Sequence, residues 1–368
     1  MSRYPLGEVR ALVEKIAVAA GVGDEDAAIL ADSLTDADLH GISTHGVSRL
    51  NIYIRRIQRG LIDPRAELRV EQHRPVALVV DAGNGLGQPQ AVKTLRHLIQ
   101  LARRYGVATA TIRRSQHFGA LSYYCNQAAS EDLVLWAMTN CEPAMSPEGA
   151  CEAFFGTNPL AVSFPTGKGF PLRVDLATSV TARGNIVAAH KAGRSIPQGW
   201  ALDSEGRPTT DAAAALAGTV LAMAGHKGAA LATMVEVFAG VLAGAAVGSE
   251  VGSMYKHMDR PQNVGHFFCL FDVAALMDVA EMKRRIDALI DRIKNCRRRQ
   301  GVEEVLVPGE REHRTSLENR RLGLLLDPET VQELRTLAAE FSIPFSLEQG
   351  SGVRGQGSEE AGPCSFDP

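Results

Sequence analysis

The sequence predicts an α+β protein in which helical segments at both ends of the chain flank a middle region of strands and helices. Three observations lead to this fold class. Apolar residues recur at helical spacing through the first seventy residues, β-rich runs separated by amphipathic stretches follow from residue 76, and helical spacing returns after Ala182. The chain has 368 residues, of which 45% are hydrophobic and 22% charged, so it can bury a sizeable core.

The composition argues against several classes of protein. The formal net charge is −3, from 39 basic and 42 acidic side chains, which disfavours a protein whose main task is to bind nucleic acid. The longest apolar run, residues 231–247, is too short for a membrane helix and contains Glu236, and the first residues do not resemble a signal peptide. The six cysteines form no C-x-x-C pair, so we expect no zinc knuckle or dithiol site and a cytoplasmic location.

Three helices are expected before residue 70. The first covers residues 6–16 and ends at Gly21, the second is capped by Asp24 and reaches residue 34, and the third runs from about residue 44 to residue 59. Strands are then predicted at residues 76–81, 106–112, 133–139, 160–164, 172–175 and 266–272. Further helices are predicted at residues 88–104, 118–130, 227–247, 282–293 and 328–340. The last residues, 346–368, are rich in Gly, Ser and Glu and predict a disordered tail.

A glycine-rich turn follows the strand at residues 76–81. Its spacing, Gly83-x-Gly85-x-Gly87, is not the G-x-G-x-x-G spacing of a dinucleotide fingerprint. Arg113 and Arg114 stand where that fingerprint places an acidic residue for the ribose. We therefore interpret the glycines as a tight turn that needs small residues rather than as a standard Rossmann site.

The segment from His40 to Arg49 has the most informative chemistry in the sequence. Thr44 is a suitable N-cap, which places His45 in the first turn of the predicted third helix with Arg49 at i+4 on the same face. The guanidinium of Arg49 can hold a carboxylate in a bidentate pair, and the imidazole of His45 can protonate a neighbouring carbonyl oxygen. The positive end of the helix is expected to lower the pKa of His45. The spacing alone is equally typical of a solvated helix face.

A metal site is not expected here. His40 and His45 are five residues apart, which places them about 140° apart around a helix, and so they do not share a face. Helical metal pairs prefer i, i+4 spacing.

The chain resembles the type-2 malate/L-lactate dehydrogenase family, which also includes sulfolactate and ureidoglycolate dehydrogenases, diketogulonate reductase and Δ1-piperideine-2-carboxylate reductase. The resemblance begins with residues 37–50, ADLHGISTHGVSRL. It continues, in the order of the family, through residues 115–121, 155–161, 175–179, 182–184, 225–228, 265–268 and 308–311. Together these motifs extend over about residues 5–342 and are specific for the family rather than for one substrate.

The resemblance implies a fold without a Rossmann domain. A cofactor-binding domain with a mixed, largely antiparallel sheet is expected from residues 73–188 and 261–310. It would pack on a helical domain built from both chain ends, residues 1–72, 189–260 and 311–345. The family forms homodimers whose active site lies near the subunit interface, and neither a nucleic acid nor a membrane is expected as a partner.

The resemblance also assigns roles to residues. His45 corresponds to the general acid, Thr44 to the hydroxyl residue that orients it, Arg49 to the carboxylate-binding arginine and Thr157 to a substrate contact. The expected cofactor contacts are His117, Phe118, Gly119, Ala120, Leu121, Asp175, Leu176, Ala177, Arg183, Gly184, His226, Lys227, Pro308, Gly309, Glu310, Arg311 and Arg314.

Several of these positions also suit a dinucleotide chemically. Backbone N–H groups at residues 117–119, near a predicted helix start, can receive pyrophosphate oxygens, and Lys227 adds a positive charge. Arg311 or Arg314 can meet a ribose phosphate, which slightly favours NADP over NAD. Bland alternatives stay open for single residues, because His117 also suits a core histidine, Lys227 a solvated helix start and Glu236 a buried structural carboxylate.

The function that these residues predict is NAD(P)-dependent hydride transfer at C2 of a small 2-oxo or 2-hydroxy acid of the malate or lactate type. The alternative is an NADPH-dependent reductase of cyclic imines such as Δ1-piperideine-2-carboxylate. In the imine-reducing branch an aspartate after the A-x-G motif assists the histidine, and Asn185 occupies that position here. An amide cannot stabilise an imidazolium as a carboxylate does, which favours the oxo acid. A catalytically idle nucleotide-binding protein is disfavoured because His45, Arg49 and Thr157 are all present.

Overall fold

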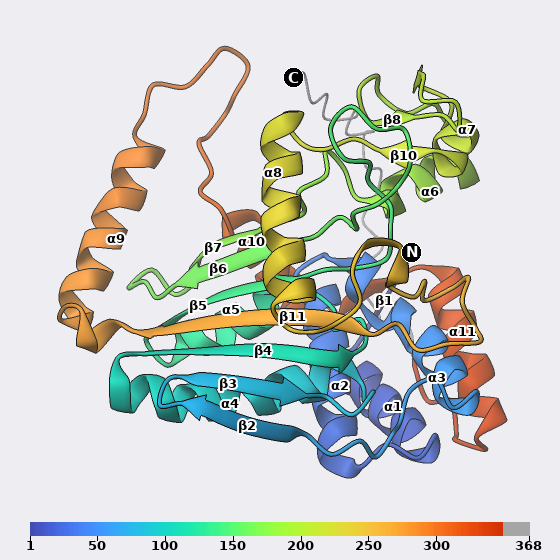
Figure 1. The fold of residues 1–368 in the computed structure, drawn as a ribbon, viewed down its shortest axis with the longest axis horizontal. Helices are drawn as coiled ribbons and strands as arrows, with labels where there is room; N and C mark the ends of the chain where they lie inside the picture. The colour runs from blue at the N-terminus through green and yellow to red at the C-terminus, as the bar shows by residue number, and fades with distance from the viewer. Residues whose placement is uncertain (349–368) are drawn as a thin grey trace.

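A seven-stranded mixed sheet forms the centre of the protein in a computed structural model that describes residues 1–348 (Figure 1). The strands lie in the order β2 (Arg69–Arg74), β3 (Ala77–Asp81), β4 (Val107–Ser115), β11 (Val264–Asp272), β5 (Leu133–Thr139), β6 (Leu160–Phe164) and β7 (Leu172–Leu176). Every neighbouring pair is antiparallel except β3 and β4. The predicted α+β class, with a mixed and largely antiparallel sheet, is confirmed.

Helices α4 (Gly87–Tyr105) and α5 (Ser122–Ser130) cover one face of the sheet. Their apolar residues share one core with the strands, in which Leu95, Tyr124, Ile112, Leu135 and Phe268 are buried. The other face carries helix α8 (His226–Val235) and the π-helical turn η3 (Glu236–Val241), which packs on β11 through Ala239. The sheet is therefore buried on both sides along its centre.

The two ends of the chain meet in one helical region. Helices α1 (Leu6–Ala19), α2 (Asp24–Leu39), α3 (Leu50–Gln58) and α11 (Pro328–Glu340) share a single apolar core. Strand β1 (Ser2–Tyr4) pairs with β12 (Leu324–Leu326), which ties the N-terminus to the C-terminal segment. The helical region built from both chain ends is confirmed.

The remaining elements lie around these two regions. They are α6 (Arg183–Lys191), β8 (Ala201–Leu202), β9 (Pro208–Thr209), α7 (Ala212–Ala217), β10 (Thr219–Val220), η4 (Gly248–Glu250), η5 (Val273–Ala275), α9 (Val279–Lys294) and α10 (Glu310–Leu322). Within residues 1–348, no helix combines the length and the apolar composition that crossing a membrane requires. The domain boundaries stay a prediction, and the predicted tail lies outside the described residues from residue 349 onward.

Two predicted helices differ from those observed. The helix predicted over residues 118–130 begins only at Ser122, because the preceding residues form an irregular loop in which Gly119 has a φ of +80°. The helix predicted over residues 227–247 is α8 followed by the π-helical turn, and Gly244 with its φ of +68° lies beyond the end of both. The sequence periodicity located both helices and the end of the first at Ser130, but it placed the start of the first too early and the end of the second too late.

The glycine-rich turn before α4 is a tight turn, as predicted. Gly83 and Asn84 have φ values of +59° and +63°. A Cβ on Gly87 would lie 2.5 Å from the carbonyl oxygen of Gln116 and 2.7 Å from Cβ of Phe118. The glycines therefore serve the turn and the close packing of α4 against the loop that follows β4.

Candidate active site

The segment that carries His45 does not form the single helix that was predicted over residues 44–59. It forms two 3₁₀ turns, η1 (Ser43–His45) and η2 (Val47–Arg49), before α3 begins at Leu50. Gly46 separates them with an extended backbone (φ −85°, ψ −155°), and Thr44 does not cap a helix. The prediction of one continuous helix is wrong because a tertiary contact at Gly46 overrides the local periodicity.

That contact comes from Asp38, near the end of α2. Its buried carboxylate accepts the backbone N–H of Val47 at 2.8 Å. A Cβ on Gly46 would lie only 2.1 Å from a carboxylate oxygen of Asp38, so the position requires glycine for its small size rather than for its φ. Burial raises the pKa of Asp38 to about 7, although the hydrogen bond from Val47 opposes the shift.

His45 is half-buried at the last position of η1. The hydroxyl of Thr44 lies 3.0 Å from Nδ1 of His45, and the His45 ring stacks on the His117 ring with centroids 5.5 Å apart. Burial, and then the positive charge of Arg49, lower the pKa of His45 to about 4. The expected direction of this shift agrees with the structure, but the expected cause, the N-terminus of a long helix, is wrong.

His117 is held by a chain of hydrogen bonds. Gln88 Nε2 donates to the Tyr53 hydroxyl at 3.0 Å, and that hydroxyl lies 2.6 Å from Nδ1 of His117. Because the Tyr53 hydroxyl accepts from Gln88, it donates its own proton to Nδ1 of His117. The single N–H hydrogen of the neutral His117 ring is therefore on Nε2. Burial, and then His45 and Arg49, lower the pKa of His117 well below its usual value. The site therefore holds two neutral, stacked imidazoles at pH 7.

Arg49 folds back over the same turn. Its Nε donates to the carbonyl oxygen of Thr44 at 2.5 Å, and its Nη1 donates to the hydroxyl of Tyr255. The guanidinium carbon also lies 5.6 Å from the centroid of the Tyr255 ring. The structure thus brings His45, Arg49 and His117 together, with one permanent positive charge beside two neutral rings.

Thr157 belongs to a second group of site residues. The backbone N–H and the hydroxyl of Thr178 donate to the carbonyl oxygen of Thr157 at 2.9 and 3.0 Å. Its hydroxyl lies 3.6 Å from Sγ of Cys141. Next to it, Asn158 donates to the buried carboxylate of Glu236 at 2.7 Å.

Glu236 is a buried structural carboxylate. Besides Asn158, it accepts the Nδ2 group of Asn140 at 3.3 Å and the backbone N–H of Gly248 at 2.8 Å. These bonds join the loop after β5, the loop before β6 and the start of η4 to the π-helical turn. The interpretation of Glu236 as a structural carboxylate is confirmed.

The starts of α6 and α8 each carry a basic side chain and a closely packed glycine. A Cβ on Gly184 would lie 3.4 Å from the side chain of Thr44, and one on Gly228 would lie 2.8 Å from the carbonyl oxygen of Thr178. Arg183 and Lys227 bring positive charge to these helix starts, where the helix dipole also favours anions. At α8, however, the backbone N–H groups of Lys227 and Gly228 already donate to the carbonyl oxygens of Ala224 and Met223. Within residues 1–348 neither cation forms an ion pair. His226 is exposed beside Lys227.

The loop after β4 contributes differently from what was expected. The side chains of Phe118 and Leu121 are buried in the core, where Phe118 stacks on His266 with centroids 3.9 Å apart. The backbone N–H of His117 donates to Gln262 at 3.1 Å. Residues 117–119 are therefore not a helix N-terminus, and the pyrophosphate contact predicted from one is not supported. Gly119 and Ala120 complete the loop.

Asp175 lies on β7, the edge strand of the sheet, and contacts the segment that follows this loop. Its carboxylate accepts the backbone N–H of Ser122 at 2.9 Å, which joins β7 to the start of α5. Burial raises the pKa of Asp175. Leu176 and Ala177, which follow, are half-buried.

The segment from Pro308 to Arg314 lies beside β7, where the carbonyl oxygen of Pro308 accepts the backbone N–H of Arg173 at 3.2 Å. Gly309 precedes α10 with a φ of +87°. Arg314 forms ion pairs with Glu304 and Glu310, and Glu310 also pairs with Lys294. Arg314 would have to give up these partners to bind a phosphate, whereas Arg311 forms no ion pair within residues 1–348.

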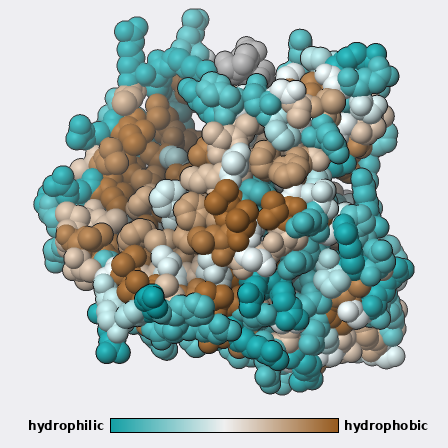
Figure 2. Space-filling view, viewed as in Figure 1, coloured by the Kyte–Doolittle hydropathy of each residue, from teal (hydrophilic) through white to brown (hydrophobic). Residues whose placement is uncertain are grey.

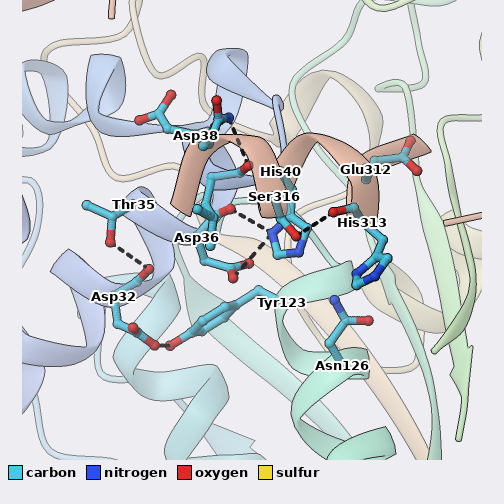
Figure 3. A network of polar contacts seen from close by, with 12 residues as sticks. Asp32, Thr35, Asp36, Asp38, His40, Tyr123, Asn126, Glu312, His313 and Ser316 are labelled. Carbon is cyan, nitrogen blue, oxygen red and sulfur yellow. Dashed lines mark hydrogen bonds and ion pairs between the residues drawn. The ribbon is translucent and has the colours of Figure 1, made fainter. Parts of the chain in front are cut away.

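A separate polar network lies at the end of α2 (Figure 3). Nδ1 of His40 lies 2.9 Å from the carbonyl oxygen of Asp36, and the Tyr123 hydroxyl donates to Asp32 at 2.7 Å. His40 and His313 line a cleft of about 610 Å³ between α2, α5 and α10. His40 thus bonds to Asp36 while His45 stacks on His117, and the two histidines do not face a common site.

Comparisons with known proteins agree with these motifs. The family model described as malate/L-lactate dehydrogenase matches residues 4–335. The (2R)-3-sulfolactate dehydrogenase (NADP(+)) of Chromohalobacter salexigens is 36% identical over 92% of this chain and 99% of its own. The sulfolactate dehydrogenase structure from Methanocaldococcus jannaschii superposes with a TM-score of 0.87, at 34% identity, over 93% of this chain and 98% of that one. The Δ1-piperideine-2-carboxylate reductase structure from Pseudomonas syringae gives a TM-score of 0.81 at 31% identity, over 92% and 100%.

The raised pKa of Asp38 predicts how stability responds to pH. The folded state binds this proton more tightly than the unfolded state, so the contribution of Asp38 to the free energy of unfolding falls as pH rises from about 4 to about 7. Asp38→Asn can still accept the Val47 N–H but does not titrate. We expect it to reduce the fall in the free energy of unfolding with pH by up to about 1.4 kcal/mol per pH unit. Urea unfolding of both proteins at pH 5, 6, 7 and 8 measures the difference. Parallel pH profiles would contradict the assignment.

Proposed function

The chain belongs to the malate/L-lactate dehydrogenase family and is an NAD(P)-dependent oxidoreductase, and we propose that its substrate is a small 2-oxo or 2-hydroxy acid of the malate or lactate type. The observation that carries this proposal is the pairing of His45 and Arg49 across two short turns. A fixed guanidinium suits the carboxylate, and an adjacent imidazole suits the oxygen on C2.

The proposed roles of His45, Thr44 and Arg49 rest on their geometry, and that of Thr157 rests on the resemblance to the family. A nicotinamide cofactor, when bound, would supply the hydride that C2 of the oxo acid accepts. His45 donates a proton to the C2 oxygen, and in the reverse direction it accepts the hydroxyl proton. Thr44 orients the His45 ring through Nδ1, which leaves Nε2 to face the substrate. Arg49 holds the carboxylate, and Thr157 contacts the substrate from the loop before β6.

The low pKa of His45 in the substrate-free structure affects the two directions of the reaction differently. A neutral imidazole accepts the proton of a hydroxy acid at pH 7, and a protonated one is a strong donor. A substrate carboxylate bound on Arg49 would offset the positive charge that disfavours the imidazolium. The pairing therefore links carboxylate binding to protonation of His45.

The cofactor is proposed to lie along the starts of α6 and α8, with NADP favoured slightly over NAD. Support comes from Arg183, Lys227 and Arg311, which form no ion pair within residues 1–348, although Nη2 of Arg183 donates to the carbonyl oxygen of Leu216 at 3.1 Å. The pairing of Arg314 with Glu304 and Glu310 counts against that residue as the partner of a ribose phosphate.

A cyclic imine is the second candidate substrate, because the chain is similar to a Δ1-piperideine-2-carboxylate reductase. The side chain of Asn185 counts against it. Its Nδ2 donates to the Thr181 hydroxyl at 3.0 Å and so is engaged within the turn that precedes α6. An amide held in this way offers His45 no negative charge.

We propose that the enzyme works as a homodimer in the cytoplasm. Val237, Val241 and Leu242 are 48%, 60% and 58% exposed on the segment that follows α8. Figure 2 shows apolar surface gathered at the centre of this face. Exposed apolar patches of this kind are typical of subunit interfaces. The five cysteines within residues 1–348 are free thiols, as expected in a reducing compartment.

The substrate class is tested by the loss of reduced-nicotinamide absorbance. NADPH and NADH are each offered with oxaloacetate, pyruvate, sulfopyruvate, diketogulonate and Δ1-piperideine-2-carboxylate. We expect turnover of an open-chain oxo acid, and a higher kcat/KM with NADPH. Turnover of the cyclic imine alone would overturn the proposed substrate class, and preference for NADH would overturn the proposed cofactor.

The role of His45 is tested by replacement and by pH. His45→Ala is expected to lower kcat by about 10²- to 10⁴-fold, the usual contribution of a general acid, while NADPH still binds in a fluorescence titration. In the wild type, kcat/KM for reduction is expected to fall about tenfold per unit from pH 5 to pH 8, because the protonated fraction of His45 falls above its pKa. A plateau over that range, or full activity of the variant, would mean that another group donates the proton.

The homodimer is tested by light scattering on the eluting protein. We expect a mass about twice 39.4 kDa. Val241→Glu is expected to shift the enzyme toward the monomer, because it places a charge in the proposed interface. Val18→Glu, at a 40% exposed position on α1, is the matched control and should leave the dimer intact. A monomeric wild type would refute the proposed assembly.

A further inference from the structure

Tyr255 makes two different contacts with Arg49 although 206 residues separate them in the chain. Its hydroxyl accepts a hydrogen bond from Nη1, and its ring lies under the guanidinium at 5.6 Å. A hydrogen bond and a cation–π contact to one arginine restrict both the position and the rotation of its planar group. The Tyr255 side chain is itself about half exposed, so the core does not require it there.

The loop that carries Tyr255 is anchored to the helix that follows Arg49. Arg56 on α3 is fully buried, and it donates to the carbonyl oxygens of Met254 at 3.2 Å, His257 at 2.9 Å and Arg260 at 3.0 Å. The backbone N–H of Met254 donates to Glu142 at 2.8 Å. Tyr255 is therefore presented to Arg49 by a loop that is fixed on both sides of it.

These contacts use only part of the hydrogen-bonding capacity of the Arg49 guanidinium. A guanidinium has five N–H groups. The Nε–H group is used by the carbonyl oxygen of Thr44, and one Nη1–H group is used by Tyr255. One N–H group remains on Nη1 and two on Nη2. Because the Nε–H group is occupied, a bidentate carboxylate is left only the Nη1–Nη2 edge, which requires that Tyr255 takes the Nη1 hydrogen pointing away from Nη2.

We propose that Tyr255 is a positioning residue for substrate binding, which holds Arg49 so that it receives the substrate carboxylate end-on. This inference rests on the proposed function, in which Arg49 binds that carboxylate. Tyr255 acts on binding through Arg49, whereas the proton donor His45 has its own hydrogen-bond partner in Thr44.

Removing the hydroxyl separates its effect from that of the ring. Tyr255→Phe keeps the cation–π contact but frees Nη1, so Arg49 loses one of its two fixed hydrogen bonds. We expect KM for the oxo acid to rise about five- to tenfold, in the range of one ordinary hydrogen bond, with kcat changed less than twofold. Tyr255→Leu removes both contacts and is expected to raise KM further. KM for NADPH should not change.

The matched control is Tyr105, which is 42% exposed and lies under the guanidinium of Arg104 at 5.1 Å. Tyr105→Phe and Tyr105→Leu should leave all three constants unchanged. In an Arg49→Lys background, Tyr255→Phe should have almost no further effect on KM, because the partner that it positions is gone. Thermal unfolding of each variant shows whether it is folded.

Three outcomes would overturn the inference. They are an unchanged KM in Tyr255→Phe, an equal rise in the Arg49→Lys background, and a parallel rise in KM for NADPH. If the wild type reduces no oxo acid, the proposed function fails. The affinity for oxalate, measured by calorimetric titration into the NADP-loaded enzyme, then replaces KM as the readout. Tyr255→Phe should then weaken oxalate binding by the same factor, and equal binding by both proteins, or none by either, would refute the role of Tyr255.

Discussion

The hydrogen bond between the Asp38 carboxylate and the Val47 backbone is the constraint on which the candidate site depends. It pulls the chain toward α2 at a point where a side chain on Gly46 would collide with the carboxylate. The chain consequently turns twice before α3 begins, and the two turns end at His45 and at Arg49. A continuous helix would have separated these residues by one regular turn and aligned them along its axis. The observed geometry instead lets Arg49 fold back onto the Thr44 carbonyl and contribute to the low pKa of His45.

The surroundings of this segment consist of polar side chains held in place by other polar side chains. Gln88 and Tyr53 fix His117, Arg56 and Glu142 fix the loop of Tyr255, and Glu236 fixes the loops of Asn140 and Asn158. Buried polar groups are costly unless they are paired, so each pair also restricts the conformation of its loop. The sheet supplies the frame, because the loops after β4 and β5 and the loops before β6 and β11 all contribute to these contacts.

The sequence predicted the fold class because apolar periodicity separates the helical ends from the stranded middle. It missed β2 and α10, since residues 69–74 are almost all polar and exposed and residues 310–322 show no apolar face. It also gave the wrong backbone for the segment around His45, because the hydrogen bond between Val47 and Asp38, nine residues earlier, determines that backbone. The motifs singled out His45, Arg49 and Thr157 as candidate site residues, but gave no sign of Tyr255 or of the burial of Phe118. Those features arise from segments far apart in the chain, and local spacing carries no signal for them.

The central claim is that His45 and Arg49 act on the same substrate from neighbouring turns. A crystal structure of the enzyme with NADP and tartronate, a 2-hydroxy acid that resembles the substrate, tests it most directly. The account predicts one carboxylate across the Nη1–Nη2 edge of Arg49, and the C2 hydroxyl within about 2.6–3.2 Å of Nε2 of His45. A carboxylate on another cation, or a C2 hydroxyl that faces His117 instead, would contradict it.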